Sequence, residues 1–282
     1  MRPRPVLLLH GGIGPDLPAR RRQLLRARLF AVCDGAYTRL QEDSAADAVV
    51  HAVRLLEDDP SFNAGTGSVL QRDGRARLSA AVMDGPRRRF AAVLNIERVR
   101  HPVLIAQALL EEEDRVLAGP EALRFARSRG FAAWDPVTPA RQREWAKRID
   151  LKPHGTVGAV ALDATGRLAA ATSTGGKWLA LPGRVSDSGQ PVGNYADDHA
   201  AVSCTGVGED IMEEALGVRL VQRAADGLTL ARAFQRTFAQ LRARGRCAAA
   251  IGVDRYGRLA WDTTQPMLLA VARTPAGRLT CC

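Results

Sequence analysis

Paired apolar runs joined by short turns constrain the fold of this 282-residue sequence more than any other feature. In the clearest pair, residues 157–162 and 168–173 flank the turn Asp163-Ala164-Thr165-Gly166. Two extended runs this close together in the chain predict an antiparallel β-hairpin. The same pattern predicts hairpins at 68–84, turning at Asp73-Gly74, and at 248–261, turning at 254–257. The chain is therefore expected to build antiparallel sheets.

Stretches with a helical spacing of apolar residues lie between these hairpins. They cover 20–41, 44–56, 102–113, 120–129, a segment beginning near 209, and 230–244, and further strands are expected at 6–10, 90–96 and 200–204. Ser44 is suited to cap the second of these helices. Residues 135–154 are polar and broken by proline, so we expect a linker there between two sheet-forming halves. This order of elements predicts an α+β fold of stacked sheets covered by helices.

The formal net charge of +10 and the sequence pI of about 10.2 raise the question of nucleic-acid binding. The excess is arginine, spread over segments that also carry Glu and Asp, and only three lysines are present. Phosphate binding draws on clustered cations, and single-stranded nucleic acid also needs aromatic side chains on which bases stack. Aromatic residues make up 5% of the chain and show no such motif, so we expect no nucleic-acid partner.

The cysteines and the apolar runs indicate a soluble protein. Five cysteines without CxxC spacing and five scattered histidines favour neither disulfides nor a zinc site. The apolar run at 6–9 is too short for a signal peptide, and no stretch approaches the ~20 apolar residues of a membrane span. We therefore expect a cytoplasmic protein with no membrane partner, folded as one domain over residues 1–282.

A threonine stands at the mouth of the second hairpin, directly after Gly155. An internal threonine hydroxyl is a poor nucleophile unless a base lies against it. If the Gly155–Thr156 bond were broken, the new α-amine of Thr156, with a pKa of about 7.7 to 8.0, would supply that base. The hydroxyl of Thr156 could make the cut itself by attacking the preceding carbonyl, because glycine tolerates strained dihedral angles. The alternative is that Gly-Thr simply begins a strand.

Three further groups could complete such a site, each with a plainer alternative. Hairpin geometry brings Thr174 opposite Thr156, although Thr-Gly-Gly is also a common strand end. Arg184 and Asp187 could hold the carboxylate and the ammonium of an amino acid, or form only a loop ion pair worth about 0 to 1 kcal/mol. At a strand-to-helix junction, Thr205 and Gly206 could form an oxyanion hole. The phosphate-binding alternative needs a GxGxxG or GxxxxGK[ST] pattern, which the junction lacks.

Taken in order, these motifs resemble the plant-type asparaginase and isoaspartyl peptidase family of N-terminal-nucleophile hydrolases. The matching motifs are HGGIG at 10–14, FNAGTGSV at 62–69, VMDG at 82–85, GTVGAVALD at 155–163, AAATSTGG at 169–176, LPGRVSDS at 181–188 and AVSCTGVGE at 201–209. The resemblance implies a four-layer αββα sandwich that cleaves itself between Gly155 and Thr156. The products would be an α chain of residues 1–155 and a β chain of residues 156–282, two such αβ units pairing as a homodimer.

The resemblance also implies an activity on small-molecule substrates, namely L-asparagine and β-aspartyl dipeptides. Thr156 would attack the side-chain amide or isopeptide carbonyl and form an acyl-enzyme that water releases. The implied site residues are Thr174, which would hydrogen-bond the nucleophile, Asn63, which would orient it, Arg184, Asp187 and Gly208 for the substrate, and Thr205 with Gly206 for both oxyanion and substrate. Catalysis would need no cofactor.

Family members also hold a structural sodium ion through main-chain carbonyls. By position, the resemblance assigns these carbonyls to Leu56, Glu57, Asp59, Phe62, Ala64 and Thr66. Carbonyl ligation leaves little signature in side chains, so the assignment follows from position in the motif alone.

The sequence departs from the family pattern at several positions near the implied site. Ser79 stands where many relatives carry Asp, Ser186 replaces a usual glycine, residues 193–195 form a shortened motif, and Lys177-Trp178 replaces the usual residues after Thr-Gly-Gly. These differences bear on substrate preference and cleavage rate. Alternative functions are a glycosylasparaginase, whose relatives favour Asp rather than Gly155 before the nucleophile, a protein-cleaving threonine aspartase, and a non-catalytic basic binding protein that has kept the fold.

Overall fold

Strand β1 (Val6–Gly14) lies inside the larger of two sheets and is covered on both faces. Leu7 and Leu9 belong to the core beneath the helices, whereas Val6 and Leu8 belong to the core between the sheets. Successive side chains of a strand point to opposite faces, so a strand buried on both faces needs a continuous apolar run. The structure, a computed structural model, describes residues 4–148 and 155–281.

The larger sheet has eight strands in the order β12-β11-β1-β5-β6-β2-β3-β4. All neighbours are antiparallel except β3 and β4. Besides β1, its strands are β2 (Leu78–Asp84), β3 (Arg89–Ile96), β4 (Val116–Ala118), β5 (Val157–Leu162), β6 (Leu168–Thr174), β11 (Met267–Thr274) and β12 (Gly277–Cys281). The predicted hairpin that turns at 163–166 is confirmed as β5 and β6.

The smaller sheet packs face to face on the larger one, and its strands are antiparallel in the order β10-β9-β8-β7. They are β7 (Asn194–Ala196), β8 (Ala200–Gly206), β9 (Ala248–Asp254) and β10 (Leu259–Thr263), and β9 with β10 forms the third predicted hairpin. Apolar side chains from β1, β5, β8, β9 and β11 fill the space between the sheets.

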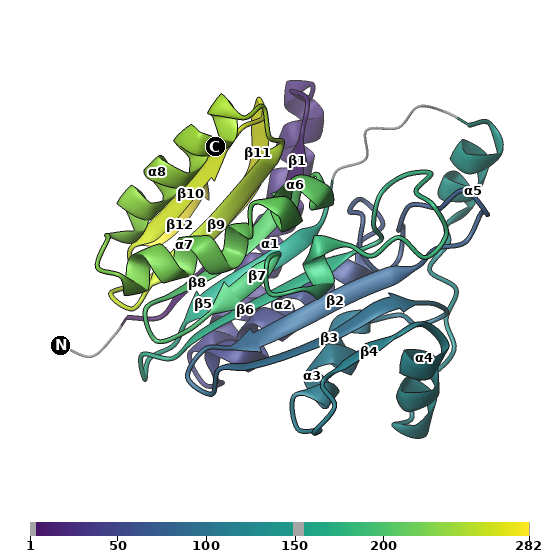
Figure 1. Cartoon of the computed structure of the whole chain (residues 1–282), viewed down its shortest axis with the longest axis horizontal. Helices are drawn as coiled ribbons and strands as arrows, with labels where there is room; N and C mark the ends of the chain where they lie inside the picture. The colour runs from purple at the N-terminus through teal and green to yellow at the C-terminus, as the bar shows by residue number, and fades with distance from the viewer. Residues whose placement is uncertain (1–3, 149–154, 282) are drawn as a thin grey trace.

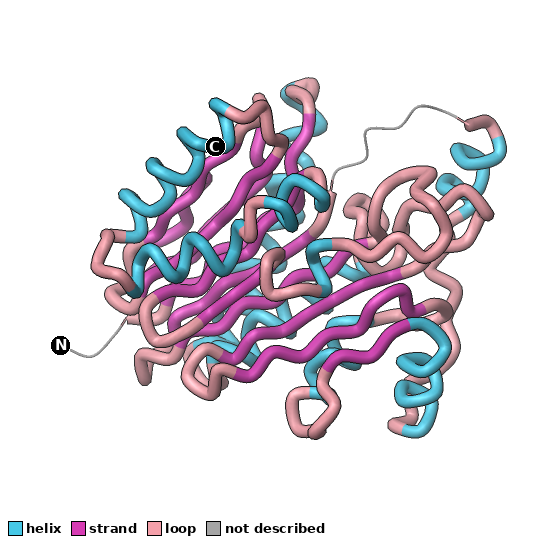
Figure 2. The backbone as a smooth tube through the Cα atoms, viewed as in Figure 1, coloured by secondary structure: helices cyan, strands magenta, loops and turns pink. Residues whose placement is uncertain are grey.

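Helices cover the two outer faces, which completes four layers (Figure 1). The larger sheet carries α1 (Ala19–Leu40), α2 (Ala45–Asp58), α3 (Pro102–Leu109) and α4 (Gly119–Ser128). The smaller sheet carries α7 (Leu216–Ala225) and α8 (Leu230–Ala243), with the short α6 (Gly208–Glu213) at the end of β8. Figure 2 shows the helices outside and the strands inside. The predicted α+β class and αββα layering are confirmed.

Helix α2 begins where the sequence predicts. The Ser44 hydroxyl accepts from the Asp47 backbone amide at 3.2 Å and lies 2.7 Å from the Asp47 carboxylate, which caps the first turn. Seven apolar residues of α2 are buried in the core beneath the larger sheet, among them Val49, Val53 and Leu56. Full burial of one such side chain contributes about 1.5–3 kcal/mol.

The hairpin predicted at 68–84 is wrong in its first arm. Asp73-Gly74 does lie in a tight turn, since the Gln71 and Arg75 backbones are hydrogen-bonded across it. The residues before the turn do not form a strand that pairs with β2, because the Leu70 carbonyl accepts a hydrogen bond from the Leu179 amide instead. Strand β2 is paired with β3 and β6.

The predicted linker at 135–154 contains a helix in its described part. Helix α5 (Pro139–Ala146) starts at Thr138, whose hydroxyl accepts from the Arg141 amide. Trp145 donates its indole N–H to the Gln71 carbonyl at 3.0 Å, which fixes α5 against the turn before β2. Residues 149–154 of this prediction lie outside the described residues.

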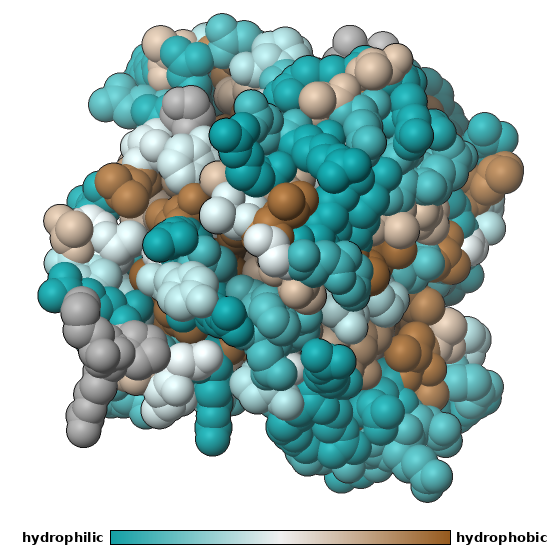
Figure 3. Space-filling view, turned by 60° about the vertical axis from the view of Figure 1, so that its left-hand side comes forward, coloured by the Kyte–Doolittle hydropathy of each residue, from teal (hydrophilic) through white to brown (hydrophobic). Residues whose placement is uncertain are grey.

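Polar side chains dominate the surface drawn in Figure 3, and apolar side chains form scattered patches on it. None of the helices described in the structure is both long and apolar enough to cross a membrane.

Candidate active site

Residue 155 packs against a bulge at the glycines of β1. The register of β1 with β11 shifts between His10 and Ile13, and Gly12 has a φ of +103°. A Cβ atom on Gly12 would lie 2.9 Å from the Cα of Gly155 and closer still to its amide nitrogen. Gly11 has as little room, because its Cβ would lie 2.6 Å from the Phe62 ring. Gly12 therefore lets the backbone before β5 approach β1 closely, and Gly11 leaves room for the Phe62 ring.

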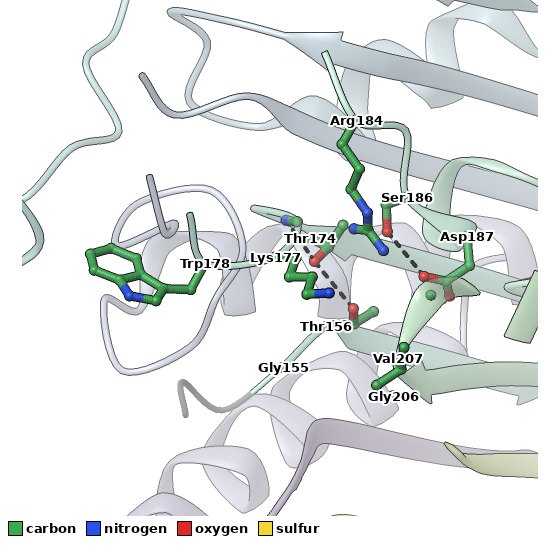
Figure 4. A pocket seen from close by; sticks show the side chains of 12 residues that line it. Gly155, Thr156, Thr174, Lys177, Trp178, Arg184, Ser186, Asp187, Gly206 and Val207 are labelled. Atoms are coloured by element: carbon green, nitrogen blue, oxygen red, sulfur yellow. Dashed lines mark hydrogen bonds between the residues drawn. The ribbon is translucent and has the colours of Figure 1, made fainter. Parts of the chain in front are cut away.

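The Thr156 hydroxyl lies at the start of β5 and faces the end of β6 (Figure 4). Thr156 is 6% exposed, and its Oγ1 donates to Thr174 Oγ1 at 3.1 Å. Because Val157 pairs with Ser173, the register of the hairpin places the two threonines opposite each other. A second hydroxyl, Ser188 Oγ, lies 3.3 Å from Thr156 Oγ1. The sequence predicts the first contact and misses the second.

A cavity of about 320 Å³ opens in front of this hydroxyl. It is lined by Gly155, Thr156, Thr174, Gly176, Lys177, Trp178, Arg184, Ser186, Asp187, Gly206, Val207 and Gly208. The cavity thus brings together segments from β5, β6, the loop after β6 and the β8–α6 junction. Thr156, Thr174, Arg184, Asp187, Gly206 and Gly208, all predicted as site residues, share this one space.

Arg184 enters the cavity already paired. Its Nε and Nη2 donate to the two carboxylate oxygens of Glu209, each at 2.9 Å. This bond, helped by the charges of Arg184 and Lys177, lowers the pKa of Glu209. Sequence reasoning missed Glu209, although it lies in the first turn of α6, where a carboxylate is favourable.

Asp187 is buried beside Arg184 and has one oxygen to spare. Its Oδ1 accepts from the Ser186 hydroxyl at 3.0 Å, while its Oδ2 has no hydrogen-bond partner in the part of the chain that the structure describes. Burial raises the pKa of Asp187 to about 6, and the Ser186 hydrogen bond and the nearby Arg184 charge only partly offset this. An unpaired buried carboxylate oxygen at a cavity wall is a position for a ligand cation.

Gly208 leaves the space in which the Arg184 guanidinium and the Asp187 carboxylate lie close together. A Cβ on this residue would lie 2.5 Å from Arg184 Nη2 and 2.8 Å from Asp187 Oδ1. Any larger residue would push the guanidinium or the carboxylate out of the cavity. The predicted substrate-binding residue Gly208 is thus close to both groups that would hold an amino acid.

Thr205 and Gly206 end β8 beside residue 155. A Cβ on Gly155 would lie 3.1 Å from Thr205 Oγ1. That hydroxyl oxygen is buried and has no hydrogen-bond partner among residues 4–148 and 155–281. Gly206 has a φ of +148° and lines the cavity. An unsatisfied hydroxyl this close to Gly155 is suited to donate to developing negative charge.

Asn63 lies outside the cavity and contacts the loop that follows β6. Its side chain donates to the Gly176 carbonyl at 2.8 Å and accepts from the Val69 amide at 2.9 Å. The Gly176 amide in turn donates to Thr174 Oγ1 at 3.1 Å. Asn63 therefore fixes the loop after β6, and with it the hydroxyl that bonds Thr156, rather than lining the cavity.

A buried polar chain lies behind Thr156 between the two sheets. Ser203 Oγ lies 2.8 Å from both His10 Nε2 and Thr172 Oγ1. Burial lowers the pKa of His10 to about 3, so the imidazole is neutral at ordinary pH. Gly158 leaves room for this chain, because a Cβ there would overlap both His10 and Ser203.

The positions expected to hold sodium lie in a loop that folds back on itself. The carbonyls of Leu56, Glu57 and Asp59 accept backbone hydrogen bonds from Asp59, Thr66 and Phe62 at 2.8–3.3 Å. A carbonyl has two lone pairs, so these groups still fit an ion held by main-chain oxygens. No cluster of three acidic, His or Cys side chains suited to a metal occurs among the described residues. The sodium site stays a prediction.

Among the departures from the family pattern, Lys177 and Trp178 line the cavity, and Ser79 and Ser186 lie close to its other groups. Ser79 pairs with Thr174 across β2 and β6, and its buried hydroxyl accepts from the Asn95 amide at 3.1 Å. Ser186 supplies the hydrogen bond to Asp187 that a glycine could not make.

Comparisons with known proteins bear on the whole chain. A family model described as asparaginase matches residues 3–279. An isoaspartyl peptidase/L-asparaginase of Nostoc sp. is 42% identical over 94% of this chain and 91% of its own length. An isoaspartyl peptidase of Salmonella typhimurium is 40% identical, with 90% of each chain covered. A plant-type L-asparaginase of Pyrobaculum calidifontis is 39% identical over 91% of this chain and 93% of its own.

Proposed function

The chain belongs to the asparaginase family, a family of N-terminal-nucleophile hydrolases, and we propose that it is an autoprocessed threonine amidohydrolase acting on L-asparagine and β-aspartyl dipeptides. Enzymes of this family need no catalytic cofactor. The observation that carries the proposal is the position of Thr156 Oγ1. Thr156 directly follows Gly155 in the chain. Its hydroxyl contacts Thr174 and faces a cavity that contains one guanidinium and one buried carboxylate.

In the maturation step, Thr156 Oγ1 attacks the Gly155 carbonyl carbon. The peptide C–N bond breaks, the nitrogen takes a proton, and the resulting ester is hydrolysed by water to the Gly155 carboxylate and the Thr156 hydroxyl. The Thr205 hydroxyl, near Gly155 and without another partner in the described residues, supports this step by donating to the carbonyl oxygen. The product carries a free α-amine on Thr156.

In the catalytic cycle, the same hydroxyl attacks the side-chain carbonyl of the substrate. The Thr156 α-amine accepts the hydroxyl proton and passes it to the leaving ammonia or amine. The C–N bond of the substrate breaks, and an aspartyl ester forms on Thr156 Oγ1. Water then attacks this ester and releases aspartate. The hydrogen bond that Thr156 Oγ1 donates to Thr174 Oγ1, and its contact with Ser188 Oγ, support the orientation of Thr156 before the attack.

Arg184 and Asp187 hold the aspartyl part of the substrate. Asp187 Oδ2 accepts from the α-ammonium, which gives the buried oxygen its missing partner. Arg184 donates to the α-carboxylate and shares its guanidinium with Glu209. A zwitterionic α-amino acid is thus matched by one cation and one anion placed beside each other by Gly208.

Denaturing electrophoresis with N-terminal sequencing tests the maturation. We expect two bands from the 30.4 kDa chain and Thr156 as a second amino terminus. Thr156→Ala should stay intact and release no ammonia from L-asparagine. Thr280→Ala, at an exposed threonine of β12, is the matched control and should mature and turn over as the parent protein does. An intact parent chain that hydrolyses asparagine would contradict the proposal.

The assembly, compartment and structural ion are proposed on the resemblance to the family. We infer a cytoplasmic homodimer of cleaved αβ units with sodium bound by the carbonyls of the loop after α2. Light scattering measures the mass of the assembly. Thermal unfolding in NaCl and in KCl of equal concentration tests the ion, because only an ion that binds the folded state raises the midpoint.

A further inference from the structure

Lys177 is a cation in the cavity that the proposed reaction does not use. It lines the cavity next to Trp178, its side chain is exposed, and it is one of only three lysines in the sequence. Among the described residues its ammonium forms no ion pair or hydrogen bond. A lysine without a protein partner at the wall of an active site is available to a ligand.

The wall of the cavity carries one more cation than free asparagine needs. It contains two cations, Arg184 and Lys177, and the buried carboxylate of Asp187, while the Glu209 carboxylate lies behind Arg184 and pairs with it. L-Asparagine presents one carboxylate and one ammonium, which Arg184 and Asp187 already match. A β-aspartyl dipeptide presents a second carboxylate on its leaving amino acid, and Lys177 supplies the second cation.

The position of Lys177 suits the leaving group rather than the aspartyl part. Figure 4 shows Lys177 and Trp178 on one side of Thr156 and Asp187 on the other. The substrate carbonyl must lie at Thr156, so a group beyond its C–N bond extends away from Asp187. The half-buried Trp178 adds an apolar wall on that same side.

The main chain that carries Lys177 is held in place. Asn63 exchanges hydrogen bonds with this loop, through its side chain to the Gly176 carbonyl and through its carbonyl to the Gly175 amide at 2.9 Å. Gly175 packs against Asn63 and Ser68 so closely that no Cβ would fit. The ammonium therefore extends from a fixed anchor one residue beyond the bonds that position Thr174.

We propose that Lys177 binds the α-carboxylate of the leaving amino acid and thereby selects β-aspartyl dipeptides over substrates whose leaving group carries no carboxylate. This inference rests on the proposed function, since it assigns a specificity-determining residue to the same site.

Two substrates that differ only in the charge at issue test the inference. β-Aspartyl-leucine carries the leaving-group carboxylate, and β-aspartyl-leucinamide replaces it with a neutral amide. The ratio of their kcat/KM values measures recognition of the carboxylate and cancels changes common to both substrates. We expect the parent enzyme to prefer the acid by about twofold to fivefold, as for a partly solvated ion pair.

Lys177→Met should bring this ratio close to one, with the change in KM rather than kcat, and Lys177→Glu should reverse it. Lys147→Met removes a charge from an exposed lysine outside the cavity and should keep the ratio of the parent enzyme. Raising the salt concentration should reduce the preference of the parent enzyme for the acid, because the pair is open to solvent.

The inference is overturned if Lys177→Met lowers both substrates equally, or if the parent enzyme shows no preference for the acid. Failure of the proposed function looks different. In that case the parent enzyme would release neither ammonia from L-asparagine, nor leucine from β-aspartyl-leucine, nor leucinamide from β-aspartyl-leucinamide, whatever residue stands at position 177.

Discussion

Replacing Gly12 by alanine tests the idea that β1 holds the bond to be cut. The added Cβ would meet the backbone of Gly155, at 2.9 Å from its Cα and 3.1 Å from its carbonyl carbon, where ordinary contacts begin at 3.4 Å. The φ of +103° at this position adds strain for any residue with a side chain. We expect Gly12→Ala to slow the proposed self-cleavage strongly.

The magnitude follows from how far the peptide must move. Because the Cβ would come closest to the amide nitrogen of Gly155, the backbone must retreat by about 1 Å, and such a misplacement of reacting groups costs about 10²-fold in rate. Backbone strain at a positive φ costs a further 1–3 kcal/mol, roughly, in stability. The two effects need to be separated.

Gly227→Ala is the control that separates them. Gly227 has a similar φ of +98°, but apart from its chain neighbours no atom of the described residues lies within 4 Å of its Cβ position, so alanine there adds strain without a clash. Both variants and the parent chain would be incubated after purification and sampled over time on denaturing gels. Loss of the 30.4 kDa band gives the cleavage rate, and thermal unfolding gives the stability.

We expect the intact band to persist about 10²-fold longer in Gly12→Ala than in Gly227→Ala, at a temperature where thermal unfolding shows both variants to be folded. Equal cleavage rates in the two variants would refute the reasoning, because the contact between Gly12 and Gly155 would then not position the bond.

Three other substitutions probe the groups around this bond. Thr174→Val removes the hydrogen bond to Thr156 Oγ1 and should lower kcat about 10- to 100-fold with little change in KM, which steady-state kinetics would detect. Because burial raises the pKa of Asp187 to about 6, its carboxylate is lost as pH falls through 6, so the KM for L-asparagine should rise there. Because this pKa lies above the unfolded value of 3.8, the charged carboxylate lowers the stability of the folded protein at neutral and high pH, and the loss is recovered as the pH falls through 6 towards 3.8. Asp187→Asn should therefore raise the free energy of unfolding at pH 8 by up to about 3 kcal/mol. The same variant should have no turnover. An Asn variant no more stable than the parent at pH 8 would contradict this origin of the shift. Gly158→Ala should destabilise the protein by about 1–3 kcal/mol, because the new Cβ overlaps Ser203; an unchanged melting temperature would mean that the polar chain behind Thr156 can move aside.

Local chemistry is sufficient to predict the parts of the site that belong to one hairpin. The turn at 163–166 sets the register of β5 and β6, and that register places Thr174 opposite Thr156. The cap at Ser44 is likewise local. Short-range patterns alone predict stacked sheets covered by helices. The order of the family motifs is what predicts the four αββα layers.

The residues that sequence reasoning missed depend on long-range contacts. Glu209 pairs with Arg184 only because α6 packs against residues 187–189, which follow the loop that carries Arg184, and a single sequence gives no sign of that approach. The bond from the Leu179 amide to the Leu70 carbonyl is also a long-range contact. It explains why the hairpin predicted at 68–84 is wrong although its turn is correct.

Helix α5 was missed for a different reason, since it has no buried residue and thus no apolar stripe for periodicity to detect. Its start at Thr138, followed by Pro139, is a signal that could have found it.

The order of strands in the larger sheet has a consequence for how long the mature enzyme lasts. Strand β1 precedes Gly155 in sequence, yet both its neighbours, β5 and β11, follow Thr156. After the proposed cleavage, one continuous ladder of hydrogen bonds joins two separate polypeptides. Unfolding would let them diffuse apart, and recovery would then need an encounter between two molecules, which dilution makes rare. The working life of such a catalyst is therefore set by how slowly it opens rather than by an equilibrium with the unfolded state.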